Sequence, residues 1–331
     1  MQYRAIESKI IENYPLKLHT TLKAGGNAEK YVRADDLEEL AAISLYAQKK
    51  GIPTTILGSG SNVLPSDQGV SGLVVHNLAD KIDISPDGEV VADTGCNFQD
   101  LFLKTAQAGL YGHEYAVGIP GTLGGALVSN AGAYRSNVSE FLAELEIVES
   151  GERRWVSPDW MEFEYRNSIL RRSNPPQCTV LRVRFKMEKG DKKAVFDEAR
   201  DYQRQRISKQ PPPASAGSFF KNVNDPELAC RVPGIPEPLQ KAGVTPAAFL
   251  LIDVGLKGFT LDGAKFAEKH NNFIVNIGGA SATAIRNLAN YGKFKVYEKY
   301  GILLEEEVLY LGNWEDYRNP YPIDYEDNNN N

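Results

Sequence analysis

The most informative segment of this 331-residue chain is GIPGTLGGALVSNAGAY, which occupies residues 118–134. It holds five glycines, and the wider stretch 115–134 contains no charged side chain, whereas a connection on a protein surface normally carries several. Glycine permits positive φ angles and lets the backbone approach a flat or charged ligand closely. The segment therefore favours a long loop that binds a ligand over an ordinary structural loop.

A second glycine-rich loop lies earlier in the chain, at Gly58-Ser59-Gly60-Ser61-Asn62, directly after a β-prone run. It is not the dinucleotide-binding motif of a Rossmann fold, because Val63 stands where the third glycine is needed. It is not a Walker loop either, because no Gly-Lys-Ser/Thr follows it. Its amides and hydroxyls suit an anion, and a tight turn is the structural alternative. Two such loops, separated by a sheet-like segment, indicate an extended cofactor with a pyrophosphate at its middle.

The composition is that of an acidic globular protein, with 37 Lys and Arg against 43 Asp and Glu and a net charge of −6. No basic block interleaved with aromatic residues is present, which disfavours nucleic-acid binding. Cys96, Cys178, Cys230 and the four histidines are scattered, so we expect neither a disulfide framework nor a metal site. The N-terminus lacks the pattern of a signal peptide, and the longest apolar run is too short to span a membrane. We therefore expect a soluble, cytoplasmic protein.

Helix-like and strand-like segments alternate along the chain and predict a mixed α+β fold. Helices are expected at 37–50, 97–108, 192–206, 247–253 and 281–300, with Asn97 as an N-cap. Strands are expected at 54–57, 73–76, 89–92, 142–148, 153–156, 179–186 and 302–310. The proline run 211–213 is the best candidate for a domain boundary, and the polar end EDNNNN is excluded from the fold as a tail.

Six motifs, taken in order, are similar to one known family. They are ILGSGSNVL (56–64), GIPGTLGGALVSNAGAY (118–134), EYRNSIL (164–170), AGSFFKN (216–222), GLKG (255–258) and LEEEVLYLG (304–312). Each motif is weak alone, but six in this order are specific, and the similarity covers about residues 15–312. On these motifs the chain resembles the UDP-N-acetylenolpyruvoylglucosamine reductase (MurB) family, flavoenzymes that complete UDP-N-acetylmuramic acid for peptidoglycan.

The resemblance implies a vanillyl-alcohol-oxidase (PCMH)-type FAD-binding domain and a C-terminal α+β substrate-binding domain. The FAD-binding region would cover 15–208, in two α+β subdomains at about 15–78 and 79–208, and the substrate-binding domain 209–300. A closing strand in 301–315 would return to the FAD-binding domain, and 316–331 would form a tail. The implied reaction reduces UDP-N-acetylglucosamine enolpyruvate with NADPH, and the hydride passes through FAD.

This chemistry needs three kinds of side chain. Hydride addition to the terminal carbon of the enol ether leaves an enolate-like species beside a carboxylate, which must be stabilised and then protonated. The family motifs match Arg166 and Glu307 as the groups that would stabilise the enolate, and Ser218 as the proton donor. Glu305 alternates in phase with Glu307, so the choice of Glu307 rests on its place directly before Val308. Without the resemblance, Arg166 would be a surface arginine and Ser218 a turn residue.

The resemblance also supplies candidate binding residues. Those expected at FAD are Gly58, Ser59, Gly60, Ser61, Asn62, Gly118, Ile119, Pro120, Gly121, Thr122, Gly124, Gly125, Asn130, Ala131, Gly132, Ala133 and Tyr134. Those expected at the substrate, whose diphosphate and carboxylate require cations, are Tyr165, Arg206, Lys209, Lys221, Asn222 and Lys257.

The chain departs from the family pattern at Thr20, where Asn is common, and at Arg135, where Gly is common after the tyrosine. Residues 186–191 lead directly from a strand toward a helix, so we expect the chain to resemble the second subtype, which lacks a tyrosine-bearing loop at this point. Two rival functions stay open: another flavin oxidoreductase of the same fold, and a catalytically silent flavin or sugar-nucleotide binding protein. The sequence does not indicate an oligomeric state.

Overall fold

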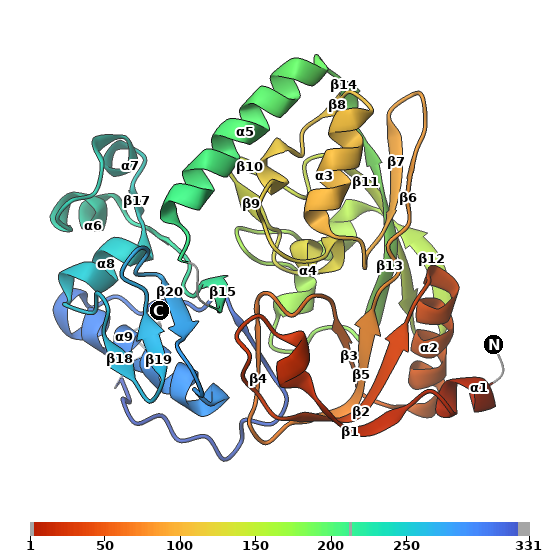
Figure 1. Ribbon diagram of the computed structural model, residues 1–331, viewed down its shortest axis with the longest axis horizontal. Coiled ribbons are helices and arrows are strands. Elements are labelled where there is room, and N and C mark those ends of the chain that lie inside the picture. The colour runs from red at the N-terminus through yellow and green to blue at the C-terminus, as the bar shows by residue number, and fades with distance from the viewer. Residues whose placement is uncertain (1–2, 212–213, 324–331) are drawn as a thin grey trace, which may run out of the picture. The chain divides into compact units, whose positions relative to one another are not determined.

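The computed structural model of the protein describes residues 3–211 and 214–323, apart from the Lys209 side chain (Figure 1). The chain forms two compact units. Unit 1 takes the described residues of Met1–His19, Asn27–Ser61 and Val70–Lys209, and unit 2 takes those of Thr20–Gly26, Asn62–Gly69 and Gln210–Asn331. Two short segments, 20–26 and 62–69, therefore leave the flavin-binding range expected from the sequence and pack within unit 2.

The first sheet of unit 1 has four strands in the order β1 (Ile11–Pro15), β2 (Asn27–Ala34), β5 (Val70–Asn77) and β3 (Thr54–Leu57). β1 is antiparallel to β2, whereas β5 runs parallel to both β2 and β3. Helix α2 (Leu37–Lys50) begins where the Asp36 side chain accepts from Glu39 N–H, and it ends at the left-handed Gly51. The helix expected at 37–50 and the strand expected at 54–57 are both confirmed.

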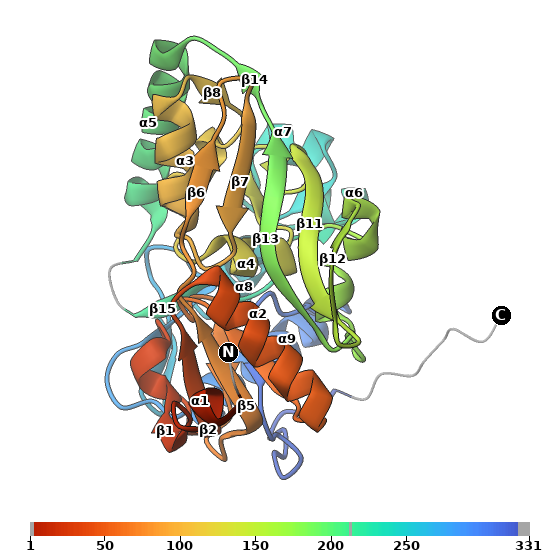
Figure 2. The same cartoon turned by 90° about the vertical axis from the view of Figure 1, so that its right-hand side faces the viewer.

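The second sheet of unit 1 has five antiparallel strands. Their order is β12 (Glu152–Val156), β11 (Leu142–Glu149), β13 (Cys178–Lys186), β7 (Glu89–Asp93) and β6 (Ile82–Ile84), and Figure 2 shows them side by side. Helix α2 packs on this sheet as well, because its apolar face shares a core with Val148 and Leu181. The two sheets of unit 1 are thus joined through one amphipathic helix.

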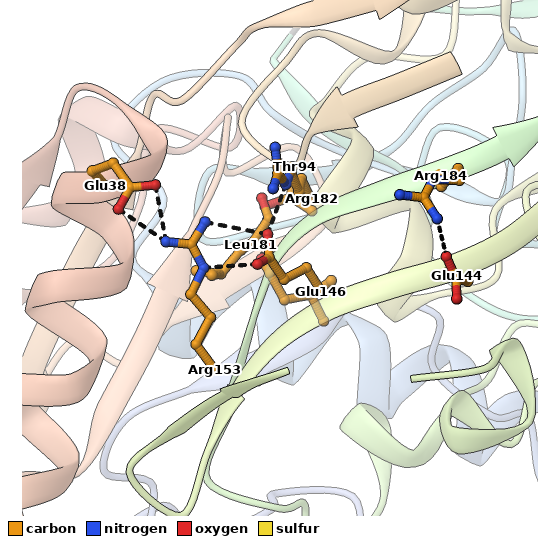
Figure 3. A network of polar contacts seen from close by, with 9 residues as sticks. Glu38, Thr94, Glu144, Glu146, Arg153, Leu181, Arg182 and Arg184 are labelled. Atoms are coloured by element: carbon orange, nitrogen blue, oxygen red, sulfur yellow. Dashed lines mark hydrogen bonds and ion pairs between the residues drawn. The ribbon is translucent and has the colours of Figure 1, made fainter. Parts of the chain in front are cut away.

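A network of ion pairs covers part of this junction (Figure 3). Glu146 lies on β11 with its side chain 7% exposed, and it accepts from Arg153 Nε at 2.8 Å and from Arg182 Nε at 2.6 Å. Arg153 also binds Glu38 of α2 at 2.9 Å. Burial would raise the pKa of Glu146, but the hydrogen bonds from the two arginines outweigh burial and lower it.

Helices α3 (Phe98–Gln107) and α5 (Lys192–Lys209) share a core with the five-stranded sheet. The predicted cap is confirmed, since the Asn97 side chain accepts from Gln99 N–H at the start of α3. A short helix, α4 (Leu123–Val128), lies inside the uncharged glycine-rich stretch. The remaining elements of the unit are short: α1 (Tyr3–Glu7), β8 (Leu110–Tyr111), β9 (Gly132–Ala133), β10 (Ser136–Asn137), β14 (Glu188–Lys189) and four 3-10 helices (Leu16–His19, Glu114–Ala116, Pro158–Met161 and Ile169–Arg171).

Unit 2 is built on a four-stranded sheet in the order β15 (Ser215–Ser218), β20 (Phe273–Asn276), β19 (Ala264–Phe266) and β18 (Thr260–Leu261). It also contains α8 (Ala247–Asp253) and α9 (Ala282–Tyr300), and smaller elements α6 (Pro226–Arg231), α7 (Glu237–Lys241), β16 (Val223–Asn224) and β17 (Val244–Thr245). The early segments complete the unit, because Leu22, Ala24 and Leu64 belong to its core and β4 (Val63–Pro65) pairs in parallel with β21 (Leu309–Leu311).

Two expectations about the end of the chain were wrong. The strand expected over 302–310 is reduced to β21, because residues 305–307 bond to the segment after Ser218 before the chain turns to pair with β4. The tail expected from residue 316 packs on α9 instead, where the Tyr317 hydroxyl donates to Asn287 Oδ1 at 2.7 Å. The Arg286 guanidinium lies over the rings of Tyr310, Trp314 and Tyr317 at 4.5, 4.5 and 4.1 Å. Residues 324–331 lie outside the described part of the chain.

Across residues 3–211 and 214–323, no helix has the length and apolar character needed to cross a bilayer. No three His, Cys, Asp or Glu side chains of these residues are grouped so as to hold a metal ion.

Candidate functional site

The two glycine-rich loops meet in unit 1. Ser61 Oγ donates to the Pro120 carbonyl at 3.0 Å. A Cβ at Gly121, where φ is +126°, would lie 2.6 Å from Ser61 Oγ, and a Cβ at Gly58 would lie 2.3 Å from Thr122 Oγ1. Glycine is therefore required at positions 58 and 121 because the loops touch there.

The second loop is anchored to the start of α3 and to the five-stranded sheet. Phe98 N–H donates to the Gly121 carbonyl at 3.0 Å, and Leu123 N–H donates to the Cys96 carbonyl at 2.9 Å. Gly124 N–H donates to the Thr94 carbonyl at 2.8 Å. Thr122 caps α4 by accepting from Gly125 N–H at 3.3 Å. The loop is thus a fixed part of the fold.

The surface that these loops offer fits the pyrophosphate of a cofactor. Within the described residues, the backbone N–H groups of Ser59 and Ser61 donate to no other group. A Cβ at the exposed Gly125 would meet only Thr122 Oγ1, at 3.7 Å, so this backbone can be approached closely. Backbone N–H groups that point to one side can bind an anion, as in a backbone nest.

A strained turn holds Arg166. Its φ is +52°, and its Nη1 and Nη2 donate to the carbonyls of Asn130 and Gly132 in the second loop. Asn130 Nδ2 donates back to the Glu164 carbonyl at 3.1 Å, and Ser168 Oγ donates to the Val128 carbonyl at 2.7 Å. Asn130, Tyr134 and Arg135 also have positive φ angles, of 41°, 54° and 73°. Such strain is concentrated at functional sites, where the surrounding structure holds it.

Arg206 joins this turn from α5. Its Nη2 donates to the Tyr115 carbonyl at 3.0 Å, and its guanidinium lies over the Tyr134 ring at 5.6 Å. Tyr134 in turn stacks on Tyr202 at 3.8 Å. Burial lowers the pKa of Arg206, and the positive charge of the nearby Arg166 lowers it further. We call Tyr115, Asn130, Tyr134, Arg166 and Arg206 the arginine cluster.

Several polar atoms of the arginine cluster are buried without a partner. In the described part of the chain, Asn130 Oδ1, Tyr115 Oη and Arg206 Nε make no hydrogen bond. Native structures pair nearly all buried polar atoms, so three such atoms in one cluster point to a ligand with both acceptors and donors. The sequence did not single out Tyr115 or Tyr202, although the spacing of Tyr202 and Arg206 places both on one face of a helix.

In unit 2 the chain brings Ser218 close to Glu307. Ser218 ends β15, and the next residue, Phe219, accepts Glu307 N–H on its carbonyl at 2.8 Å. Phe220 and Glu306 form an isolated antiparallel bridge, and Lys221 N–H donates to the Glu305 carbonyl at 2.9 Å. The segment of the three glutamates therefore lies beside the segment that carries Ser218, the candidate proton donor.

The three glutamates have different surroundings. Glu305 pairs with Lys221 at 3.0 Å and its side chain is 72% exposed. Both oxygens of Glu306 bind Lys293 Nζ at 3.0 Å, a contact that could not be predicted from the sequence. Glu307 is half-buried, and Asn62, the last residue of the first glycine loop, donates from Nδ2 to its carbonyl at 3.1 Å. These surroundings are consistent with the choice of Glu307 within the run.

The other candidate substrate residues are dispersed. Tyr165 is 49% exposed and lies beside the Arg166 guanidinium at 5.2 Å. Asn222 Oδ1 accepts from Ala247 N–H at 3.4 Å, and Lys257 is exposed in the turn after α8. Lys221 is engaged with Glu305, and the side chain of Lys209 lies outside the described part.

A pocket of about 430 Å³ opens elsewhere in unit 1, and Asn97, Asp100 and Lys104 of the α3 region line it. None of the site residues expected from the sequence lines this pocket.

Models of two protein families match the chain. The model described as FAD binding domain matches residues 28–156, and the model described as UDP-N-acetylenolpyruvoylglucosamine reductase, C-terminal domain, matches residues 207–311. The first range contains both glycine-rich loops, and the second contains Ser218 and Glu307.

Relatives match the chain over most of its length. UDP-N-acetylenolpyruvoylglucosamine reductase of Bacillus subtilis is 34% identical over 92% of this chain and 94% of its own. The protein of the same name from Acaryochloris marina is 38% identical over 88% of this chain and 90% of its own. The crystal structure of the Thermus caldophilus enzyme (MurB) superposes with a TM-score of 0.72 and 30% identity, over 91% of this chain and 98% of that one.

These matches confirm the expected fold class, an α+β chain with an FAD-binding domain and a MurB-type C-terminal domain. They confirm the expected enzyme class, a flavoprotein oxidoreductase, and they support FAD and NADPH as its cofactors. With both domain models in the expected order and relatives above 30% identity over nine-tenths of its length, the chain belongs to the UDP-N-acetylenolpyruvoylglucosamine reductase (MurB) family.

Proposed function

We propose that this protein reduces UDP-N-acetylglucosamine enolpyruvate to UDP-N-acetylmuramate with NADPH, as a cytoplasmic step of peptidoglycan precursor synthesis. The observation that carries the proposal is the pairing of the Ser218 and Glu307 segments in unit 2, where Glu307 N–H binds the carbonyl of Phe219. A hydroxyl and a carboxyl group far apart in the sequence are thereby held on neighbouring backbone segments. A protein that merely binds flavin or a sugar nucleotide has no need of this arrangement.

FAD supplies the hydride chemistry, since it can take a hydride from NADPH and return it to a carbon acceptor. The residues proposed to hold it are the touching loops of unit 1, with Ser59, Ser61 and Gly125 as backbone contacts for the pyrophosphate. The remaining members of the two loops, from Gly118 to Tyr134, would shape the surface around it. Asn130 and Tyr134, whose φ angles are positive, would form the end of this FAD-binding surface.

The proposed chemistry adds one hydride and one proton across the enolpyruvyl double bond. The hydride goes to the terminal carbon, and the electron pair of the double bond moves onto the carbon that carries the carboxylate. The Arg166 cation and Glu307, acting as the neutral glutamic acid, stabilise the resulting enolate, and Ser218 donates its hydroxyl proton to that carbon. The serine is afterwards reprotonated from solvent, so the net change is consumption of NADPH and one proton.

The arginine cluster supports a role for Arg166 in binding an anion. Its two guanidinium groups lie close enough for Arg166 to lower the pKa of Arg206, and Arg206 Nε is buried without a partner among the residues that the structure describes. A carboxylate or phosphate would relieve the repulsion and accept this donor. The proposed substrate carries both groups. We propose that Tyr165, Lys209, Lys221, Asn222 and Lys257 contribute further contacts to it.

The chain between β13 and α5 supports assignment to the second subtype. β13 ends at Lys186, the two-residue strand β14 follows, and α5 begins at Lys192. This leaves no room for an additional loop bearing a substrate-covering tyrosine.

One spectroscopic experiment tests the proposed function. The visible absorption of the FAD-loaded protein is recorded anaerobically, after NADPH, and again after UDP-N-acetylglucosamine enolpyruvate. We expect the flavin band to bleach with NADPH and to return with the substrate. Bleaching without return would favour another flavin oxidoreductase of the same fold, and a protein that binds no FAD would refute the proposal.

We expect Ser218→Ala to separate the two half-reactions. Flavin reduction by NADPH should stay close to the wild-type rate, because it requires no proton from Ser218. Reoxidation by the substrate should slow by about 10²–10⁴-fold, the usual contribution of a positioned proton donor. Stopped-flow absorbance measures both rates, and an equal loss in both would show that Ser218 is structural.

A further inference from the structure

One buried side chain holds the two residues that follow Ser218. Asn272, 3% exposed, accepts Phe220 N–H on Oδ1 at 3.0 Å and donates from Nδ2 to the Phe220 carbonyl at 2.8 Å. Its own carbonyl accepts Phe219 N–H at 2.7 Å. Asn272 therefore makes three hydrogen bonds to the backbone of these two residues, where a neighbouring β-strand would otherwise supply such bonds.

The same two residues also bind the segment that carries Glu307. Phe219 is the link: its N–H donates to Asn272, and its carbonyl accepts Glu307 N–H. Phe220 pairs with Glu306 in an isolated bridge. Any shift of the Phe219–Phe220 backbone would therefore move Ser218 and Glu307 relative to each other.

The chain before Ser218 is held less firmly than the chain after it. The pairing of β15 with β20 is irregular between Ser215 and Ser218. Gly217, with φ +78°, has open space where a Cβ would stand. Phe219 and Phe220, in contrast, are 0% and 1% exposed. The position of Ser218 is thus determined mainly by the residues that follow it, Phe219 and Phe220, which Asn272 holds.

We propose that Asn272 is a positioning residue for proton donation, and that its amide fixes the separation of the Ser218 hydroxyl and the Glu307 carboxyl. The inference rests on the proposed function, because it assigns Asn272 a role in the same reaction. Asn272 acts through the backbone, since both ends of its side-chain amide are used by Phe220. It affects proton delivery to the substrate and leaves hydride uptake from NADPH unchanged.

The neighbouring residue provides a matched control. Asn271 is 1% exposed, and in the amide orientation that satisfies both of its ends, Nδ2 donates to the Leu256 carbonyl and Oδ1 accepts from Ile252 N–H, both at 3.3 Å, at the end of α8. It is therefore a buried asparagine of the same unit that holds a different segment. A purely structural effect of losing a buried amide should be similar at both positions.

The test compares Asn272→Ala, Asn272→Asp and Asn271→Ala as FAD-loaded proteins, at a temperature where all three are folded. Asn272→Asp keeps an acceptor for Phe220 N–H but places a carboxylate oxygen against the Phe220 carbonyl. For both Asn272 variants we expect reoxidation by the substrate to slow on the order of 100-fold, because a small misplacement of a reacting group has such an effect. Flavin reduction by NADPH should change little.

Two further measurements identify the step and the cause. The solvent deuterium isotope effect on reoxidation should rise in the Asn272 variants, because proton transfer becomes slower relative to hydride transfer. Amide hydrogen exchange at Phe219 and Phe220, measured without substrate, should accelerate in these variants and stay normal in Asn271→Ala.

The outcomes separate the inference from the proposed function. If the wild-type flavin is not reoxidised by the substrate, the proposed function fails and the inference fails with it. If the wild type is competent but the Asn272 variants match it, the inference alone is overturned. It is also overturned if both half-reactions slow equally, or if Asn271→Ala produces the same selective loss.

Discussion

His113 shows how burial alone sets the chemistry of a residue. It is 1% exposed, and four aromatic rings surround it, those of Phe98, Tyr115, Phe141 and Phe185. Within the described residues neither ring nitrogen makes a hydrogen bond. Burial lowers the pKa of His113 from 6.5 to about 4, so the folded protein holds it neutral.

This shift predicts acid sensitivity. The unfolded chain binds a proton at His113 below about pH 6.5, whereas the folded protein resists it until about pH 4. Stability from neutral His113 is therefore complete above pH 6.5 and is lost as the pH falls toward 4, by about 3 kcal/mol in all. In urea titrations from pH 7 to pH 4, His113→Phe and His113→Leu should lose less stability than the wild type.

The free energy of unfolding of these variants should still fall somewhat with pH. Part of this remaining fall should come from His76, whose pKa is also lowered to about 4 by burial and by the nearby His19. Parallel curves for the wild type and both His113 variants would show that His113 titrates normally in the folded protein.

The sequence supplied candidate site residues, but it did not predict their surroundings. Motif similarity picked out Arg166 and Arg206, but it could not show that both lie in one cluster with Tyr115 and Tyr134. That proximity depends on how α5 packs against the glycine-rich stretch, which is a tertiary property. Asn272 was missed for the same reason, because its amide acts on a segment more than 50 residues away.

At the scale of elements, the paired glycine loops are the feature on which the proposed mode of cofactor binding depends. Their contact requires glycine at Gly121, where φ is +126° and a Cβ would stand 2.6 Å from Ser61 Oγ. The sequence predicted the loops, and it predicted α2, α8 and α9 nearly to the residue. It did not predict α4, because a six-residue helix is too short to show a period and lies among glycines.

We expect Gly121→Ala to weaken FAD binding at least 10-fold, which corresponds to about 1.4 kcal/mol. The added methyl group must push Ser61 away, and the backbone must hold an unfavourable φ, so the two loops separate. Isothermal titration of the apoprotein with FAD measures the affinity.

Gly151→Ala is the control, because Gly151 also has a positive φ, of 79°, but has open space around the added Cβ and lies in the hairpin between β11 and β12. It should lose some stability and keep its affinity for FAD. Normal FAD affinity in Gly121→Ala would refute the assignment of these loops.

At the scale of the whole molecule, the chain builds unit 2 from three separate stretches. Asn276 Nδ2 donates to the Leu22 carbonyl at 2.9 Å, which ties residues 20–26 to the sheet of the unit. The Asp67 carboxylate accepts from Ala282 and Thr283 N–H at 2.9 and 2.7 Å and so caps α9. The sequence could not show this, because a proline run marks a boundary along the chain but gives no sign of which earlier segments cross it.

This topology predicts that the C-terminal part cannot fold alone. A fragment of residues 207–331 lacks Leu22 and Leu64, each fully buried and worth about 1.5–3 kcal/mol, as well as the Asp67 cap and the partner of β21. These losses approach the whole stability of a typical domain, about 5–15 kcal/mol. The fragment should therefore show poorly dispersed amide resonances and no cooperative thermal transition, whereas the full chain should show well-dispersed resonances and a cooperative transition. A cooperative transition in the isolated fragment would contradict this prediction, because it would show that the core of unit 2 is complete without residues 20–26 and 62–69.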